Sequence, residues 1–118
     1  MKVLLSSILL ILFAIQDDFT FVNENQKVVL KIDNGVRTLT WGKKSILNLK
    51  IENIDLQKMT MSAPGIRFIK SKNPTEEVKL EVTPDREVTE KDTLNLHVGF
   101  RNKNNEYIHH RFSIVITK

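Results

Sequence analysis

The chain has 118 residues, of which 41% are hydrophobic, so it has room for one domain with one core. Its formal net charge is only +4, and no segment combines a dense Lys/Arg stripe with interleaved aromatic residues, which argues against nucleic-acid binding. The chain has no Cys, which excludes disulfides, Cys-ligated metals and a lipid-modified Cys.

Residues 1–16 have the pattern of a secretory signal peptide. Lys2 supplies a short positive region, residues 3–15 are apolar apart from two Ser residues, and a run of this length is short for a bilayer span. We expect cleavage near Gln16, with Ala14 at the −3 position; an uncleaved N-terminal anchor is the alternative. Removing Lys2 from the 18 basic residues leaves 17 against 14 acidic ones, a balance of +3.

An exported domain without disulfides favours a bacterial periplasm or the cell exterior. The one match to a glycosylation acceptor, Asn73-Pro74-Thr75, is disqualified by its Pro. We therefore expect a core stabilised by apolar packing alone, and no membrane association after cleavage.

The folded domain is expected over residues 27–118. The segment 17–26 is polar around Phe19-Thr20-Phe21-Val22 and forms either a flexible arm or an edge strand. Residues 27–32 alternate as a strand, in which every second side chain points inward.

Asn34-Gly35 is a hairpin signal, because these residues supply the two positive φ angles of a type I′ turn. We predict a hairpin in which Leu30 pairs with Leu39 and Val28 with Trp41. Trp41 is then a core or rim anchor, and a ligand-stacking role is the alternative.

Residues 45–52 alternate apolar and polar side chains and predict a second strand. Pro64-Gly65 predicts a turn that pairs Met61 with Phe68. The charged segment 86–92 is predicted to be a solvated connection between two sheets, since nothing in it holds a carboxylate in a dry pocket.

Two long alternating segments near the C-terminus predict a further hairpin. Matching their apolar faces requires an odd loop length, which a loop at 103–105 provides. This register pairs Phe100 with Ile108 and Leu96 with Phe112.

No segment has a sustained helical period, and seven or eight strands are spaced about 8–12 residues apart. This pattern predicts an all-β fold, an immunoglobulin-like antiparallel β-sandwich.

The C-terminal register places His97 opposite Arg111 and diagonal to His109 on the outer face, while His110 points the other way. A two-His metal site with Glu106 nearby is conceivable, but the Arg111 cation would lie beside the metal. We therefore predict no metal site.

Catalytic signatures are missing from the sequence. There is no Gly-x-Ser-x-Gly motif and no Gly-rich loop to cradle a phosphate, so we predict no catalytic residue, no cofactor and no enzymatic activity. The predicted surface contacts are Trp41, His97, Tyr107, His109 and Arg111.

A family resemblance rests on the central part of the chain. The stretch 42–49 (Gly-Lys-Lys-Ser-Ile-Leu-Asn-Leu), followed by Ile54-Asp55, Met59-Thr60-Met61, Gly65-Ile66 and Thr83-Pro84, resembles domains of the periplasmic gliding-motility M-type protein of the type IX secretion machinery of Bacteroidetes. Ser45-Ile46 stand where that family has Asn-Pro. The resemblance implies a stand-alone immunoglobulin-like domain of the cell envelope that makes protein–protein contacts, and it carries over no catalytic residue.

Three functions are weighed on this basis. The first is an envelope module that binds another envelope protein through strand edges and loop tips. The second is a small carbohydrate-binding or adhesive domain that uses Trp41, Tyr107 and nearby Asn side chains. The third is a metal-binding or enzymatic protein that uses His97 and His109. The first is our prediction, with no oligomeric state attached.

Overall fold

Nine strands in two sheets form most of the regular structure in the computed structural model, which describes residues 19–70, 76–87, 89 and 91–118. The predicted signal peptide and the Asn73-Pro74-Thr75 site lie outside these residues. Two short 3₁₀ turns, η1 (Asp33–Gly35) and η2 (Leu56–Lys58), complete the described elements.

The first sheet has five antiparallel strands. Their spatial order is β1 (Thr20–Asn23), β2 (Gln26–Ile32), β4 (Ser45–Glu52), β7 (Glu77–Val82) and β6 (Ile66–Ile69). Of the two alternatives for the segment 17–26, an arm or an edge strand, its described part forms the edge strand β1, which pairs Phe21 with Val28.

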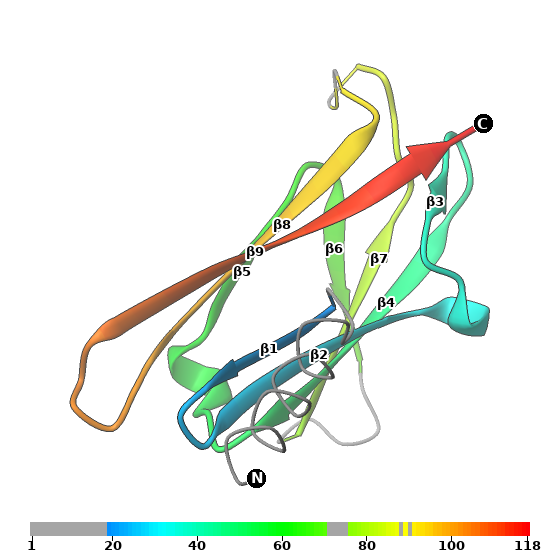
Figure 1. Cartoon of the computed structure of the whole chain (residues 1–118). Helices are drawn as coiled ribbons and strands as arrows, with labels where there is room; N and C mark the ends of the chain where they lie inside the picture. Colours follow the sequence, from blue (N-terminus) through cyan, green and yellow to red (C-terminus); the bar gives the residue numbers. More distant parts are fainter. Residues whose placement is uncertain (1–18, 71–75, 88, 90) are drawn as a thin grey trace, which may run out of the picture.

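The second sheet has four strands and crosses over the first (Figure 1). Their order is β3 (Leu39–Thr40), β9 (Tyr107–Thr117), β8 (Thr93–Arg101) and β5 (Thr60–Ser62). β3 runs parallel to β9, whereas the other pairs are antiparallel. The tip of the β8–β9 hairpin, orange in Figure 1, extends beyond the other elements.

This topology confirms the immunoglobulin-like β-sandwich. The orders β2-β4-β7-β6 and β9-β8-β5 match the ABED and GFC sheets of immunoglobulin domains. The described chain has nine strands, where about seven or eight were predicted; β1 adds an edge to the first sheet, and β3 joins the second sheet instead of pairing with β2.

The core lies between the sheets and is formed by the inward side chains that the alternation predicts. Leu47, Leu49, Leu80, Leu96 and Phe100 are fully buried, with relative exposures of 0%. Burying a side chain of this size stabilises the fold by about 1.5–3 kcal/mol.

The predicted hairpin at Asn34-Gly35 is wrong, although its turn chemistry is right. Asn34 and Gly35 have the expected positive φ angles of 64° and 70°. The chain then crosses to the other sheet, so Leu30 pairs with Leu49 and Leu39 with Ile116. After this crossing, Leu39 is buried between the layers from the side of the second sheet.

The predicted pairing across Pro64-Gly65 is also wrong. The chain turns there, with Gly65 at a φ of 74°, but the turn connects two different sheets. Met61 pairs with Val98, and Phe68 pairs with Leu80. Pro-Gly favours a type II turn, whose twist does not suit a tight hairpin.

The C-terminal hairpin is confirmed in its register. Phe100 pairs with Ile108 and Leu96 with Phe112. The backbone N–H of Asn102 donates to the carbonyl of Glu106 at 3.0 Å and closes the loop. The segment 86–92, of which residues 88 and 90 are not described, connects the two sheets as predicted.

Gln26 connects three parts of the chain at one end of the sandwich. Its side chain is buried, and Nε2 donates to the carbonyl of Asn53 at 3.2 Å and to that of Arg101 at 3.0 Å. These two bonds join the start of β2 to the end of β4 and to the end of β8. Oε1 of Gln26 is buried without a partner, which offsets part of the gain.

Replacing Gln26 by Leu should therefore lower the free energy of unfolding by about 1–2 kcal/mol, because two carbonyl groups lose their donors. Urea denaturation measures the change. Lys31→Ala, on the exposed side of the same strand, should stay within about 0.5 kcal/mol of the parent protein. Equal stability of Gln26→Leu and the parent protein would contradict this role.

Candidate binding face

The outer surface of β8 and β9 brings four of the five predicted contact residues together. Alternate residues of both strands point away from the core, and β5 extends the surface on one side. We call this surface the β8–β9 face; its residues are Thr60, Ser62, Thr93, Asn95, His97, Gly99, Arg101, Tyr107, His109, Arg111, Ser113, Val115 and Thr117.

A histidine pair occupies the middle of the face. His97 lies opposite Arg111, as predicted, and its Nδ1 is 3.2 Å from Nε2 of His109. The two rings stack, with their centroids 5.3 Å apart. A hydrogen bond at this distance requires one ring to donate its N–H and the other to accept.

Tyr107 lies across the backbone of Gly99. A Cβ atom at Gly99 would overlap the phenol ring and would come within 2.8 Å of Oγ1 of Thr60. The hydroxyl group of Tyr107 is 3.4 Å from the same Oγ1, so the ring spans from β9 over β8 to β5. Even so, Tyr107 remains 52% exposed. The missing side chain of Gly99 makes the slot that holds this aromatic ring.

Two arginines flank these rings. The guanidinium carbon of Arg101 lies 5.5 Å from the centroid of the Tyr107 ring, and Nη1 donates to the carbonyl of Asn105 at 3.1 Å. The side chain of Arg111 is exposed, and within the described residues its guanidinium group makes no hydrogen bond or ion pair. It is therefore available to a partner.

Trp41 does not belong to this face. Its backbone N–H donates to the carbonyl of Thr117, at the far end of β9 from Tyr107. Ten residues of strand separate these ends, which is roughly 33 Å at about 3.3 Å per residue. Trp41 is half-buried against the core, and the guanidinium group of Arg86 lies 3.9 Å from its ring, so the predicted rim position holds.

His110 points to the core side, as its place in the alternation predicts. Its ring stacks on Phe21 of β1 with centroids 4.2 Å apart, and its edge-to-face distance to Phe112 is 4.6 Å. Burial lowers the pKa of His110, and the nearby His109 lowers it further. The stack attaches the edge strand β1 to the other sheet.

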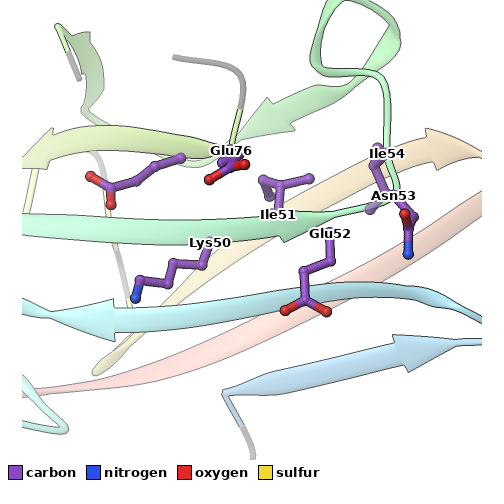
Figure 2. Close-up of a pocket in the computed structure, with 7 residues that line it drawn as sticks. Lys50, Ile51, Glu52, Asn53, Ile54 and Glu76 are labelled. Atoms are coloured by element: carbon purple, nitrogen blue, oxygen red, sulfur yellow. The ribbon is translucent and has the colours of Figure 1, made fainter. Parts of the chain in front are cut away.

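A hollow of about 830 Å³ lies at the end of β4, lined by Lys50, Ile51, Glu52, Asn53, Ile54, Glu76 and Glu77. Figure 2 shows Lys50 and Glu52 on one side of the β4 ribbon and Glu76 on the other, so Glu52 and Glu76 do not converge. Within the described residues, no three His, Asp or Glu side chains are grouped to hold a metal ion.

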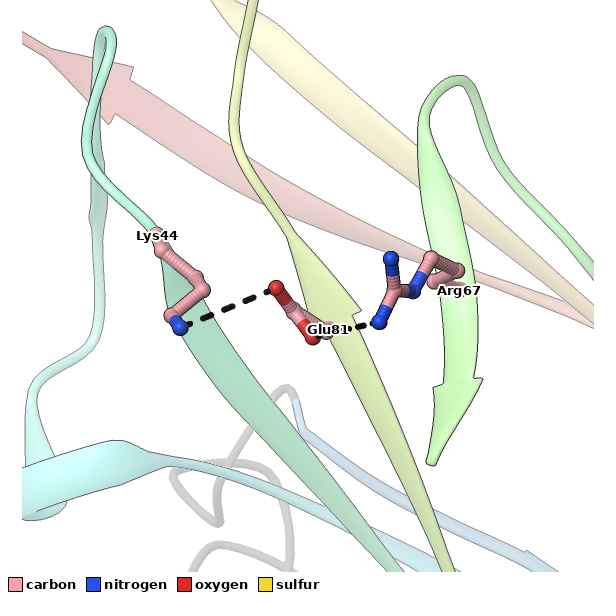
Figure 3. A network of polar contacts seen from close by, with 3 residues as sticks. All are labelled: Lys44, Arg67 and Glu81. Carbon is pink, nitrogen blue, oxygen red and sulfur yellow. Dashed lines mark ion pairs between the residues drawn. The ribbon is translucent and has the colours of Figure 1, made fainter. Parts of the chain in front are cut away.

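The outer face of the five-stranded sheet has a different composition. Lys and Glu alternate across its strands, with Lys27 opposite Glu52 and Lys50 opposite Glu77. In Figure 3, Glu81 lies between Lys44, at 3.8 Å, and Arg67, at 3.7 Å. The β8–β9 face contains no Lys, Asp or Glu.

In the described part of the chain, exposed apolar side chains are scattered and form no single patch. Val22 and Phe68 are 58% and 62% exposed, but they lie on β1 and β6, at opposite edges of the five-stranded sheet. Val115, on β9, is exposed in the other sheet. Scattered residues of this kind are ordinary on a protein surface, which leaves composition and geometry as the features that distinguish the β8–β9 face.

No protein-family model, curated protein or solved structure matches this chain. In the described part of the chain, neither helical segment has the length and apolar character to span a bilayer. The residues that sequence reasoning did not select are Gly99 and Arg101. A Gly inside a strand, with Tyr107 diagonal to it in the predicted register, was the available signal.

Replacing Gly99 by Ala should displace the Tyr107 ring, since the new methyl group would occupy its place. The ring is the end of a flexible side chain, so stability should fall by only about 1 kcal/mol or less. The measurement is the nuclear Overhauser contact between the Tyr107 ring and Thr60, which should disappear. Ser113→Ala, elsewhere on the face, should preserve it, and a persisting contact in Gly99→Ala would contradict the slot.

The free energy of unfolding should fall on acidification below about pH 6.5, in part because of His110. Its folded-state pKa lies below the ordinary value of 6.5, so the unfolded chain binds more protons in this window and stability rises with pH. His110→Phe keeps the ring stack and should flatten the dependence between about pH 5 and 7. Urea denaturation across this range measures it; an unchanged slope in the variant would contradict the role of His110.

Proposed function

We propose that the protein is a non-enzymatic, exported β-sandwich module of the bacterial cell envelope that binds another protein through its β8–β9 face. The observation that carries the proposal is the composition of this face. It presents Tyr107, Arg101 and Arg111 and contains no Lys, Asp or Glu. Protein interfaces are enriched in Tyr and Arg and depleted of Lys, Asp and Glu.

The restricted positions of several side chains in the β8–β9 face support the same function. Tyr107 is held over Gly99, and His97 contacts His109, so these side chains have less freedom to lose when a partner binds. The edge strands of this sheet, β3 and β5, contain only two and three residues. Edges this short leave little backbone for a partner strand to pair with, so we assign recognition to the face instead of the edges.

The proposed location in the cell envelope is argued from the sequence. Residues 1–16 have the pattern of an export signal, and the resemblance to gliding-motility M-type domains indicates the same envelope location. The carbohydrate-binding alternative assigns Trp41 and Tyr107 to one binding surface. They lie at opposite ends of β9, so we do not propose this second function.

The test is capture from envelope extract with the mature chain as bait, compared between matched variants. A specific protein should bind the parent chain, and Tyr107→Ala/His109→Ala should weaken binding by about 2 kcal/mol, which is roughly thirtyfold. Interferometry with the captured protein measures the affinity.

Lys31→Ala/Lys79→Ala changes the outer face of the five-stranded sheet and serves as the control, which should bind as the parent does. Two outcomes would refute the proposed function: capture of no protein, or a protein that binds the Tyr107→Ala/His109→Ala variant as tightly as the parent.

A further inference from the structure

We infer that the partner presents an acidic protein surface to the β8–β9 face. This inference rests on the proposed function and names the chemistry of the partner. The permanently charged groups of the face are Arg101 and Arg111, and both are positive. No carboxylate of the face neutralises them.

The described acids that adjoin the face in sequence already have partners. Glu106, beside Tyr107, accepts a hydrogen bond from Nδ2 of Asn102 at 3.2 Å. Asp92, which precedes β8, pairs with Arg86 at 2.9 Å. The neutral Asn102 amide leaves the charge of Glu106 in place, but among the described residues neither acid forms an ion pair with Arg101 or Arg111. These two guanidinium groups are therefore left to pair with carboxylates from outside the domain.

The excess of positive charge is confined to the β8–β9 face, as the outer face of the five-stranded sheet shows. There, cross-strand pairs set Lys27 against Glu52 and Lys50 against Glu77, so positive and negative groups alternate. An uncompensated positive surface attracts a negatively charged partner during encounter and disfavours like-charged ones. For the same reason, two copies of the chain would repel one another face to face, which makes a different protein the fitting occupant.

The positions of the arginines specify the spacing that a partner needs. Arg101 lies opposite Tyr107, and Arg111 follows Tyr107 by four residues along β9. At about 3.3 Å per residue, the Cα positions of the two arginines are roughly 13 Å apart along the hairpin. Two carboxylates at this spacing could each accept paired hydrogen bonds from one guanidinium group. Tyr107 would meet an apolar group near one of them.

An anionic membrane is the competing occupant, and the face fits it less well. Recognition of anionic lipid commonly uses clusters of four to eight Lys or Arg residues. This face has two arginines, and Lys91 adjoins it in a hollow that Asn95 and His97 also line, which is still fewer cations than such a cluster contains. A protein surface with a few placed carboxylates therefore matches the site better.

The experiment uses ¹⁵N-labelled mature chain and three probes at low ionic strength: hexaglutamate, hexalysine and phosphatidylglycerol vesicles. Hexaglutamate should shift the amide signals of His97, His109 and Arg111, and hexalysine should not. Arg101→Gln and Arg111→Gln should each weaken hexaglutamate binding roughly fivefold. Raising the salt concentration to about 0.5 M should abolish the shifts, because screening is stronger there.

Lys31→Gln is the matched control, since it removes one positive charge from the opposite face. If it weakened hexaglutamate binding as much as Arg111→Gln does, the effect would be net charge alone and the inference would be overturned. Shifts confined to other surfaces, or a response to the vesicles without one to hexaglutamate, would overturn it too.

The captured partner separates failure of this inference from failure of the proposed function. In one outcome, Tyr107→Ala/His109→Ala loses binding, but Arg101→Gln, Arg111→Gln and added salt leave the affinity unchanged. This outcome would support the proposed function and contradict the inference of an acidic partner. Full binding in all of these variants would contradict both the proposed function and the inference of an acidic partner.

Discussion

The alternation of side chains along β8 and β9 is the constraint on which the rest of the structure depends. One set of side chains, including Leu96, Phe100 and Phe112, fills the core, and the other set forms the β8–β9 face. A slip of one residue in this pairing would expose the core set and bury the arginines, and the free energy lost would exceed the stability of a small domain. Packing of the core therefore also fixes which side chains of β8 and β9 form the β8–β9 face.

The sequence was most informative where local chemistry and burial demanded the same pairing. In the C-terminal hairpin, the two apolar faces require an odd loop, and Asn105 favours the three-residue loop because it takes the left-handed conformation, with a φ of 60°. At Asn34-Gly35 and Pro64-Gly65 the turn residues fix backbone angles, but they do not determine which sheet the next strand joins. That choice is made by burial between layers, which depends on residues far away in the chain.

The candidate site was predictable to a similar degree. The pairing of β8 with β9 was enough to place His97, His109 and Arg111 beside one another. It did not show that Tyr107 reaches over Gly99. The alternation along a strand shows which face a side chain is on, but not how far the side chain extends across the neighbouring strands. It also could not separate Trp41 from the others, since the position of Trp41 depends on the crossing of β3 to the second sheet.

That crossing also determines how the domain would respond to mechanical load. β3 lies parallel to β9, with Leu39 beside Ile116 and Thr40 beside Thr117. Tension that draws the chain before β3 away from the C-terminus pulls these two strands in opposite directions along their length. Their hydrogen bonds are then strained together in shear, instead of parting one after another as in an unzipping hairpin. The smallest strand of the fold thus ties the C-terminal strand to the beginning of the domain when the chain is stretched.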